Sequence, residues 1–264
     1  MRQIRAQLER LAREQATGTL LLGDDGAFHL LDGQVVHAET GLAPSLHDLL
    51  TASGRLSEQG WEGLRTRGPG QGPASPARLT GTELEAHALI QLFDAAFFLL
   101  RSAHEPEFHG GKRAYWPDCL AVDPVTLCVE TRRRRGLLDE AWPSPLADDG
   151  PVEPVRRLRR QRVILTGLQM EILLNADGRK TPSGLARELG RTRFGCTLAV
   201  RGLVASALVR EPEPAAGGDP APRGRIGGAP LRDQGAPPFG GPTKWADVDL
   251  ALLTQLHDAL RELE

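Results

Sequence analysis

The stretch from 212 to 243, rich in proline and glycine, limits most strongly how this chain can fold. Its sequence, "PEPAAGGDPAPRGRIGGAPLRDQGAPPFGGPT", has too little apolar content to offset the entropy that is lost when a backbone becomes ordered. We therefore predict a disordered linker over 212–243. A packed core has to form from the preceding residues, and the last segment, 244–264, is expected to be a separate element.

The overall composition excludes several classes of protein. Hydrophobic residues make up 40% of the chain and charged residues 25%, and the net charge is -2, so no global charge favours nucleic acid or a membrane surface. Three widely spaced cysteines indicate neither a disulfide framework nor a zinc site. The longest apolar run, 88–100, is too short for a membrane span of about 20 residues and contains Gln91 and Asp94. The charged N-terminus lacks the apolar core of a signal peptide, so we expect a cytoplasmic protein that does not bind membranes.

A small antiparallel sheet is predicted in the stretch "GTLLLGDDGAFHLLDGQVVHAETG", residues 18–41. The expected strands cover 19–22, 27–31 and 34–39. Asp32-Gly33 lies between two apolar runs, which is typical of a type I′ hairpin turn, because both central residues of that turn need positive φ. The expected pairs are Leu31 with Gln34, Leu30 with Val35, His29 with Val36, and Phe28 with His37.

This register separates the two histidines of the stretch. Side chains alternate between the faces of a sheet, so His29 and His37 are predicted on opposite faces, where they cannot bind one ion. Asp24 and Asp25 lie in a turn, where acidic residues form local backbone hydrogen bonds. We therefore predict no metal site and no catalytic site here, and we find no catalytic constellation or cofactor site elsewhere in the sequence.

Helices are predicted on both sides of this sheet. Residues 2–15 have the periodicity of a short amphipathic helix, and 124–138 fits a helix that opens on a proline. The strongest helix prediction covers 82–100, where Thr82 is the expected N-cap and Glu85 completes a capping box.

The first half of the chain resembles a known family. The order of an N-terminal helix, "TGTLLL", a "DG" hairpin and "VHAETG", with His37-Ala38 before Gly41, is similar to the PATAN domain of bacterial signalling proteins. The likeness extends to the arginine-rich helix that ends near Leu138. It implies a non-catalytic protein-interaction module of bacterial regulatory systems, discussed alongside response regulators and small GTPases. We place this PATAN-like domain at 1–141 and a connector at 142–154.

Residues 155–211 are predicted to form a winged-helix-like domain of three helices. Thr181 caps the second helix with Pro182 at its first position, and Gly190 ends it. The third helix, from Thr192, takes the place of a recognition helix.

Two sets of residues in this domain are candidates for contact with double-stranded DNA. The first set lies on one stripe of the third helix and could face a major groove: Arg193, Thr197 and Arg201. The second set precedes the first helix and could contact phosphates: Arg156, Arg157, Arg159, Arg160 and Arg162. Because the third helix is mostly apolar and proline cuts the wing short, a protein-docking or dimerisation domain is an equal alternative.

The C-terminal segment, 244–264, returns to helical periodicity. Its apolar face consists of Trp245, Val248, Leu252, Leu256 and Leu263. A helix this short is marginal alone, so the face needs a surface to pack on. It either folds back onto its own chain or is presented to a partner, and we favour the partner.

Together these features predict an α+β protein without cofactors. We expect a non-enzymatic regulatory protein that acts in bacterial signalling or transcription control through protein contacts, with DNA binding by residues 155–211 left open. The alternative is a DNA-independent adaptor or scaffold for a small GTPase or a response regulator. A homodimer is compatible with either function.

Overall fold

The computed structural model describes residues 2–67, 79–111, 120–158 and 162–213. All of them belong to one compact unit, Met1–Ala215, while a second unit, Ala216–Glu264, lies outside the described residues. The described residues contain nine helices, a four-stranded antiparallel sheet and one pair of two-residue strands, which confirms the predicted α+β class. The predicted linker and C-terminal helix fall outside the description, apart from residues 212 and 213.

The sheet forms where the sequence predicts it and gains a fourth strand from further along the chain. Its strands are β1 (Gly18–Leu21), β2 (Ala27–Leu31), β3 (Gln34–Glu39) and β4 (Glu107–Gly110), in the order β3-β2-β1-β4. Asp32 and Gly33 both have positive φ, 48° and 79°, as the predicted turn requires.

The predicted register holds next to the turn and is wrong beyond it. Leu31 pairs with Gln34 and Leu30 with Val35, as expected, but the register then shifts between His29 and Leu30. The structure therefore pairs His29 with His37, and Phe28 with Ala38. A bulge places one extra residue on one strand. The side chains of that strand beyond the bulge therefore lie on the opposite face from the one that the predicted register gives them. The prediction that the histidines lie on opposite faces is thereby corrected.

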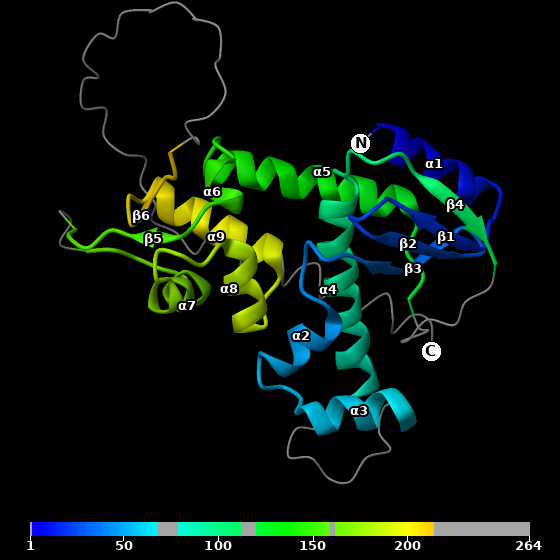
Figure 1. Ribbon diagram of the computed structural model, residues 1–264, viewed down its shortest axis with the longest axis horizontal. Coiled ribbons are helices and arrows are strands. Elements are labelled where there is room, and N and C mark those ends of the chain that lie inside the picture. Colours follow the sequence, from blue (N-terminus) through cyan, green and yellow to red (C-terminus); the bar gives the residue numbers. More distant parts are fainter. Residues whose placement is uncertain (1, 68–78, 112–119, 159–161, 214–264) are drawn as a thin grey trace, which may run out of the picture. The chain divides into compact units, whose positions relative to one another are not determined.

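Three helices supply the side chains that bury the sheet: α1 (Arg2–Arg13), α4 (Gly81–Leu99) and α5 (Pro124–Ala141). Leu8 of α1, Leu92 of α4 and Leu127 of α5 are fully buried in one cluster with Phe28 of β2. Full burial of such a side chain stabilises the fold by about 1.5–3 kcal/mol. Figure 1 shows α4 alongside the sheet, with α5 crossing at the top of the view.

The N-cap of helix α4 lies two residues earlier than predicted. Thr80 is its N-cap and accepts a hydrogen bond from the Glu83 N–H, while the Glu83 carboxylate accepts one from the Thr80 N–H. The sequence "TGTELE" contains two overlapping Thr-x-x-Glu frames, and the apolar periodicity does not distinguish them. The predicted capping box of Thr82 and Glu85 is therefore the wrong frame.

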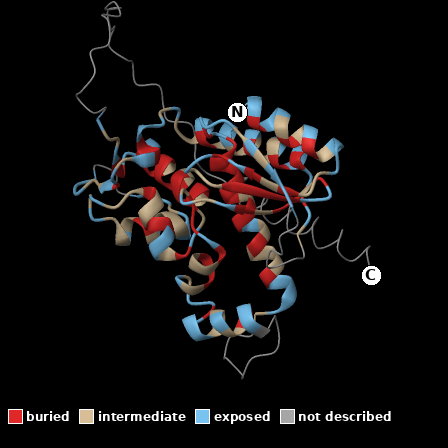
Figure 2. Cartoon of the chain, turned by 45° about the vertical axis from the view of Figure 1, so that its right-hand side comes forward, coloured by how far each residue is buried: buried red, intermediate tan, exposed pale blue. Residues whose placement is uncertain are grey.

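Two short helices pack against the first half of α4: α2 (Leu46–Thr51) and α3 (Glu58–Arg67). Leu50 and Leu64 join Leu84 of α4 in a small separate cluster. Figure 2 shows that α3, at the bottom of the view, is largely exposed, whereas the sheet is largely buried.

The second half of the described chain is mainly helical. Its elements are α6 (Leu146–Asp149), β5 (Glu153–Pro154), α7 (Gly167–Asn175), α8 (Pro182–Leu189), α9 (Arg193–Ala205) and β6 (Val209–Arg210). As predicted, Thr181 caps α8 and Gly190 ends it with a left-handed backbone. Ile172, Leu185 and Leu203 are fully buried in a cluster formed by these elements.

Candidate functional site

Helix α9, the predicted recognition helix, is enclosed by the rest of the unit. It contacts α4, α5, α6, α7 and α8. Arg193, Thr197 and Arg201 expose only 9%, 3% and 4% of their surfaces. The expectation that these three side chains face a major groove is corrected, because they point into the protein.

The carboxylate of Asp94, in the second half of α4, binds the first turn of α9. Its Oδ2 accepts a hydrogen bond from the Arg193 N–H at 2.8 Å, and its Oδ1 accepts one from the Phe194 N–H at 2.9 Å. The first N–H groups of a helix have no partner within the helix, and the helix dipole favours a negative charge there. Asp94 therefore caps α9 from another helix and fixes α9 against α4.

Burial sets the electrostatics of this contact. Desolvation is the largest influence and raises the pKa of Asp94 above that of an ordinary carboxyl group. The hydrogen bonds from the backbone of Phe194 and Arg193 oppose this rise, as do the charges of Arg134 and Arg193. We did not predict this role from the sequence. The available signal was an acidic residue at a core position of an apolar run, which needs buried donors.

The side chain of Arg193 joins three parts of the protein. Its guanidinium donates to the Leu42 carbonyl at 2.6 Å and to the Asp149 carboxylate at 2.5 Å, and it lies 4.2 Å from the centre of the Phe98 ring. Arg187 of α8 donates to the neighbouring Gly41 carbonyl. The loop that follows β3, which carries the end of the "VHAETG" signature, is thus bound by arginines of α8 and α9.

Arg201 forms a second buried ion pair on α9. Its Nε and Nη2 donate to the two oxygens of Asp148 at 2.6 and 2.7 Å, and its Nη1 donates to the Trp142 carbonyl at 2.7 Å. A bidentate pair of this kind is strong and directional. The positive charges of Arg193 and Arg201 are therefore paired with carboxylates of the protein itself.

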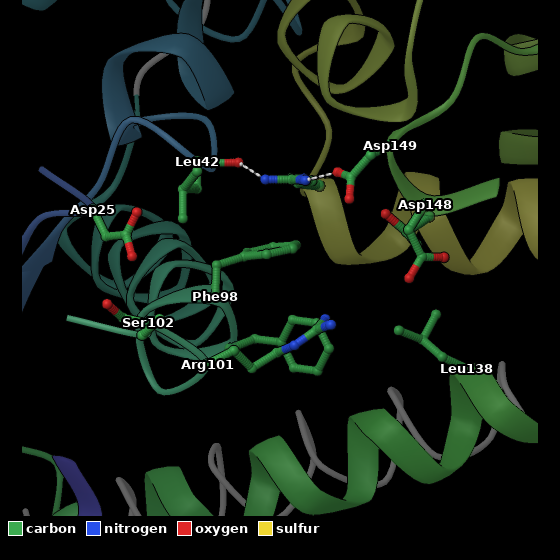
Figure 3. Close-up of a pocket in the computed structure, with 12 residues that line it drawn as sticks. Asp25, Leu42, Phe98, Arg101, Ser102, Leu138, Asp148 and Asp149 are labelled. Atoms are coloured by element: carbon green, nitrogen blue, oxygen red, sulfur yellow. Dashed lines mark hydrogen bonds and ion pairs between the residues drawn. The ribbon is translucent and has the colours of Figure 1, made fainter. Parts of the chain in front are cut away.

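A pocket of about 290 Å³ opens beside Arg193 (Figure 3). The end of α4 supplies Phe97 and Phe98, and Arg101 follows just after the helix. Helix α6 supplies Asp148 and Asp149, and α9 supplies Arg193 and Thr197. The other lining residues are Asp25, Leu42, Ser102, Ala103 and Leu138. The pocket thus lies where the end of α4 meets α6 and α9.

The histidines of the N-terminal stretch form a row on one face of the sheet. The rings of His29 and His37 stack at 5.7 Å, and Thr19 Oγ1 lies 3.0 Å from His29 Nδ1. The Glu39 carboxylate lies 3.3 Å from His29 Nε2 and 3.9 Å from His37 Nε2. Desolvation lowers the pKa of His37, and the charge of Glu39 opposes this.

This arrangement brings together side chains that the predicted register had separated. Even so, the described residues contain no group of three or more His, Cys, Asp or Glu side chains placed to hold a metal ion. The pairing of the two rings follows from the bulge, which the spacing of the sequence did not reveal.

The basic segment before α7 is exposed. Arg156, Arg157 and Arg162 lie on the surface without an ion-pair partner among the described residues, whereas Arg159 and Arg160 fall outside the description. Large apolar side chains are exposed in the same region: Leu158, Val163, Ile164, Met170 and Leu174. Ile164 and Leu174 expose 86% and 76% of their surfaces. These three arginines and five apolar residues are exposed within one stretch of sequence, 156–174, and we call them the basic–apolar surface.

The candidate docking residues of the C-terminal segment, Trp245, Val248, Leu252, Leu256 and Leu263, lie outside the described residues. Within the described part of the chain, no helix is long and apolar enough to cross a membrane. Comparison with known proteins gives no family model, no curated protein and no solved structure that matches this chain.

Proposed function

We propose that this chain is a non-enzymatic regulatory protein that binds another protein, in bacterial signalling or transcription control. The observation that carries the proposal is the basic–apolar surface. Exposed apolar patches bounded by polar residues mark protein-interaction sites, and Ile164 and Leu174 are far more exposed than apolar side chains usually are. The resemblance of the first half to PATAN domains supports a response regulator or a small GTPase as the class of partner.

The chemistry of the surface indicates the kind of segment that it binds. Arg156, Arg157 and Arg162 have no acidic partner among the residues that the structure describes. An amphipathic segment with acidic residues beside its apolar face would complement both the charge and the apolar side chains. Such a contact would bury apolar area and pair the arginines at its rim.

A DNA-independent adaptor is the form of this function that the geometry supports best. Arg193, Thr197 and Arg201 are engaged or buried within the protein, so α9 presents no polar stripe that could read base edges. The three helices and the β5–β6 pair support a winged-helix-like scaffold. They do not support a role for α9 in reading DNA. DNA binding is kept as a second candidate, because exposed Arg156, Arg157 and Arg162 could contact phosphates.

The experiment compares capture of partner proteins by matched variants of the full-length chain. Ile164→Asp with Leu174→Asp places charges in the proposed surface, whereas Val125→Asp with Val129→Asp places them at exposed positions of α5. We expect the wild type and the α5 variant to retain one defined protein from native lysate and the first variant to lose it. The purified partner should then bind more weakly as salt rises from about 50 to 200 mM, because charge pairing contributes to the contact.

A labelled duplex DNA tests the second candidate with the same proteins. Salt-sensitive binding to DNA that is lost in Arg156→Gln with Arg157→Gln, but kept in the Ile164/Leu174 variant, would replace the adaptor function with DNA binding. Equal capture of partners by all variants would reject the basic–apolar surface as the binding site.

A further inference from the structure

We propose that the free edge of strand β4 pairs with the same edge of a second copy of this chain, so that the two sheets join into one. This edge is separate from the basic–apolar surface, and its occupant is another copy of the chain rather than a different protein. The proposal depends on the place of β4 in the sheet, on its exposure, on the direction of its backbone hydrogen-bonding groups and on the order of its side chains.

Strand β4 lies at one edge of the sheet and is open to solvent. It pairs with β1 on one side, and no other strand of the described residues pairs with it (Figure 1). All of its residues are exposed except Phe108, which is half-buried. The opposite edge differs, because Val35 of β3 exchanges backbone hydrogen bonds with Val122. An open edge presents unpaired N–H and C=O groups, which makes β4 a template for another strand.

The backbone groups of β4 point alternately toward β1 and toward the free edge. The Gly111 N–H donates to the Thr17 carbonyl at 3.2 Å, and the His109 carbonyl lies beside the first residue of β1. The odd-numbered residues therefore turn their N–H and C=O groups toward β1. Because the groups of successive residues point to opposite sides of a strand, those of Phe108 and Gly110 point to the free edge.

A two-fold axis that keeps both cores on the same side of the joined sheet limits how the two copies pair. Residues directly opposite each other in an antiparallel pair share a face, so the axis has to pass beside one residue of the strand. Centring on Phe108 pairs its N–H and C=O with those of the partner's Phe108, and it brings the Gly110 N–H to the carbonyl of the partner's Pro106. Proline has no N–H, so this register requires of Pro106 only the acceptor that it has.

The side chains of β4 complement one another in this register. Glu107 lies opposite the partner's His109, and His109 lies opposite the partner's Glu107, so each imidazole can donate to a carboxylate. Within one copy the same two groups already meet, with Glu107 Oε1 at 3.1 Å from His109 Nε2. The ring of Phe108 packs against the main core and would meet the partner's ring at the axis. Centring on His109 would instead place the two imidazoles opposite each other, so the order of the side chains favours the axis at Phe108.

The experiment is sedimentation velocity of the full-length protein at concentrations from about 5 to 500 μM. We expect a reversible equilibrium between monomer and dimer with a Kd of about 10–100 μM, because a few backbone hydrogen bonds and one aromatic pair form a small interface. A chain that stays monomeric over the whole range overturns the proposal.

Two variants of Gly110 test the edge itself. Gly110→Pro removes the N–H that donates to the partner, whereas Gly110→Ala keeps it. This N–H points away from β1, so proline leaves the pairing within one copy intact. We expect Gly110→Pro to weaken dimerisation at least about tenfold and Gly110→Ala to change it less than about threefold. A dimer that survives Gly110→Pro but is lost in Ile164→Asp with Leu174→Asp would place the interface on the basic–apolar surface and overturn the proposal.

An exchange of charges tests the register. His109→Glu places carboxylates opposite each other on both sides of the axis and should weaken dimerisation about fivefold or more. Adding Glu107→Lys restores pairs of opposite charge and should return the Kd to within about threefold of the wild type. Gln59→Glu adds a negative charge at an exposed position of α3 and should leave the Kd unchanged. The proposed pairing is overturned if the double variant stays as weak as His109→Glu, or if Gln59→Glu weakens dimerisation equally.

Discussion

Asp94 and Asp148 are buried carboxylates that each bind helix α9. Asp94 accepts from backbone N–H groups at the start of the helix, and Asp148 pairs with the side chain of Arg201 in its second half. Both contacts replace hydration that the groups lose on burial. Arg193 and Arg201, two of the arginines that the sequence suggested for DNA, are thereby explained as structural partners of acidic residues.

Removing the acceptor at Asp94 should destabilise the fold. Asp94→Ala leaves two buried N–H groups unpaired, and each unpaired donor costs about 1–3 kcal/mol. We therefore expect urea denaturation to show a fall of about 3 kcal/mol in the free energy of unfolding, and a smaller fall for Asp94→Asn, which keeps one acceptor oxygen. Equal stability of all three proteins would contradict the capping role.

The raised pKa of Asp94 gives a pH dependence of defined sign. The folded protein holds the Asp94 proton more tightly than the unfolded chain, so this group stabilises the fold most at low pH and less as pH rises through its folded-state pKa. Asp94→Asn removes this dependence. The stability of the wild type relative to Asp94→Asn should therefore decline as pH rises above the ordinary value of 3.8. An unchanged difference between about pH 4 and pH 8 would refute the assigned shift.

The Arg201–Asp148 pair predicts a contrast between buried and exposed ion pairs. Arg201→Met leaves the Asp148 carboxylate buried without its partner, which costs about 3–5 kcal/mol. Arg191→Met breaks the more exposed Arg191–Glu171 pair and should cost less than about 1 kcal/mol. Thermal and urea unfolding of the two variants measure the difference, and similar losses would show that Asp148 is not desolvated as described.

At the scale of the elements, the contact between α8 and α2 depends on a single glycine. Gly190 ends α8 with φ of 60°, and a Cβ at this position would lie 2.3 Å from the backbone nitrogen of Ser53. Glycine is thus required at this position for two reasons: the helix ends in a left-handed conformation, and the two chain segments approach too closely for a Cβ atom.

Gly190→Ala should therefore cost more than a left-handed alanine alone. Gly54 has a similar φ of 72° but open space around its Cβ position, so Gly54→Ala is the matched control, with an expected loss of about 1–2 kcal/mol. We expect at least twice that loss for Gly190→Ala in the free energy of unfolding. Equal losses would show that α8 and α2 do not approach each other so closely.

Local patterns in the sequence predicted most elements but not their finer alignment. Asp32-Gly33 and the Thr181–Gly190 helix form as expected, because turn and cap chemistry acts within a few residues. The bulge beside His29 was not predictable, since the strand pattern reads the same with or without one extra residue. As a result, the predicted register placed His29 and His37 on opposite faces of the sheet, whereas in the structure their rings stack.

At the scale of the whole molecule, the residues before and after the predicted connector at 142–154 share contacts. Asp94 binds the backbone of α9, and Arg193 binds the Leu42 carbonyl. The sequence could not predict this docking, because an apolar α9 is expected equally for the core of an independent three-helix domain. The one missed clue was Asp94, whose position within an apolar run required a buried donor.

Amide hydrogen exchange at Arg193 and Phe194 tests most directly that α9 is fixed inside the fold by Asp94. The full-length protein is exchanged at neutral pH and read by NMR or by mass spectrometry of overlapping peptides. We predict that both amides exchange only through global unfolding, with the same protection as the central strand β2, and that Asp94→Ala removes this protection. Rapid exchange of both amides in the wild type would contradict the account, because it would show an α9 whose first turn is free of the carboxylate.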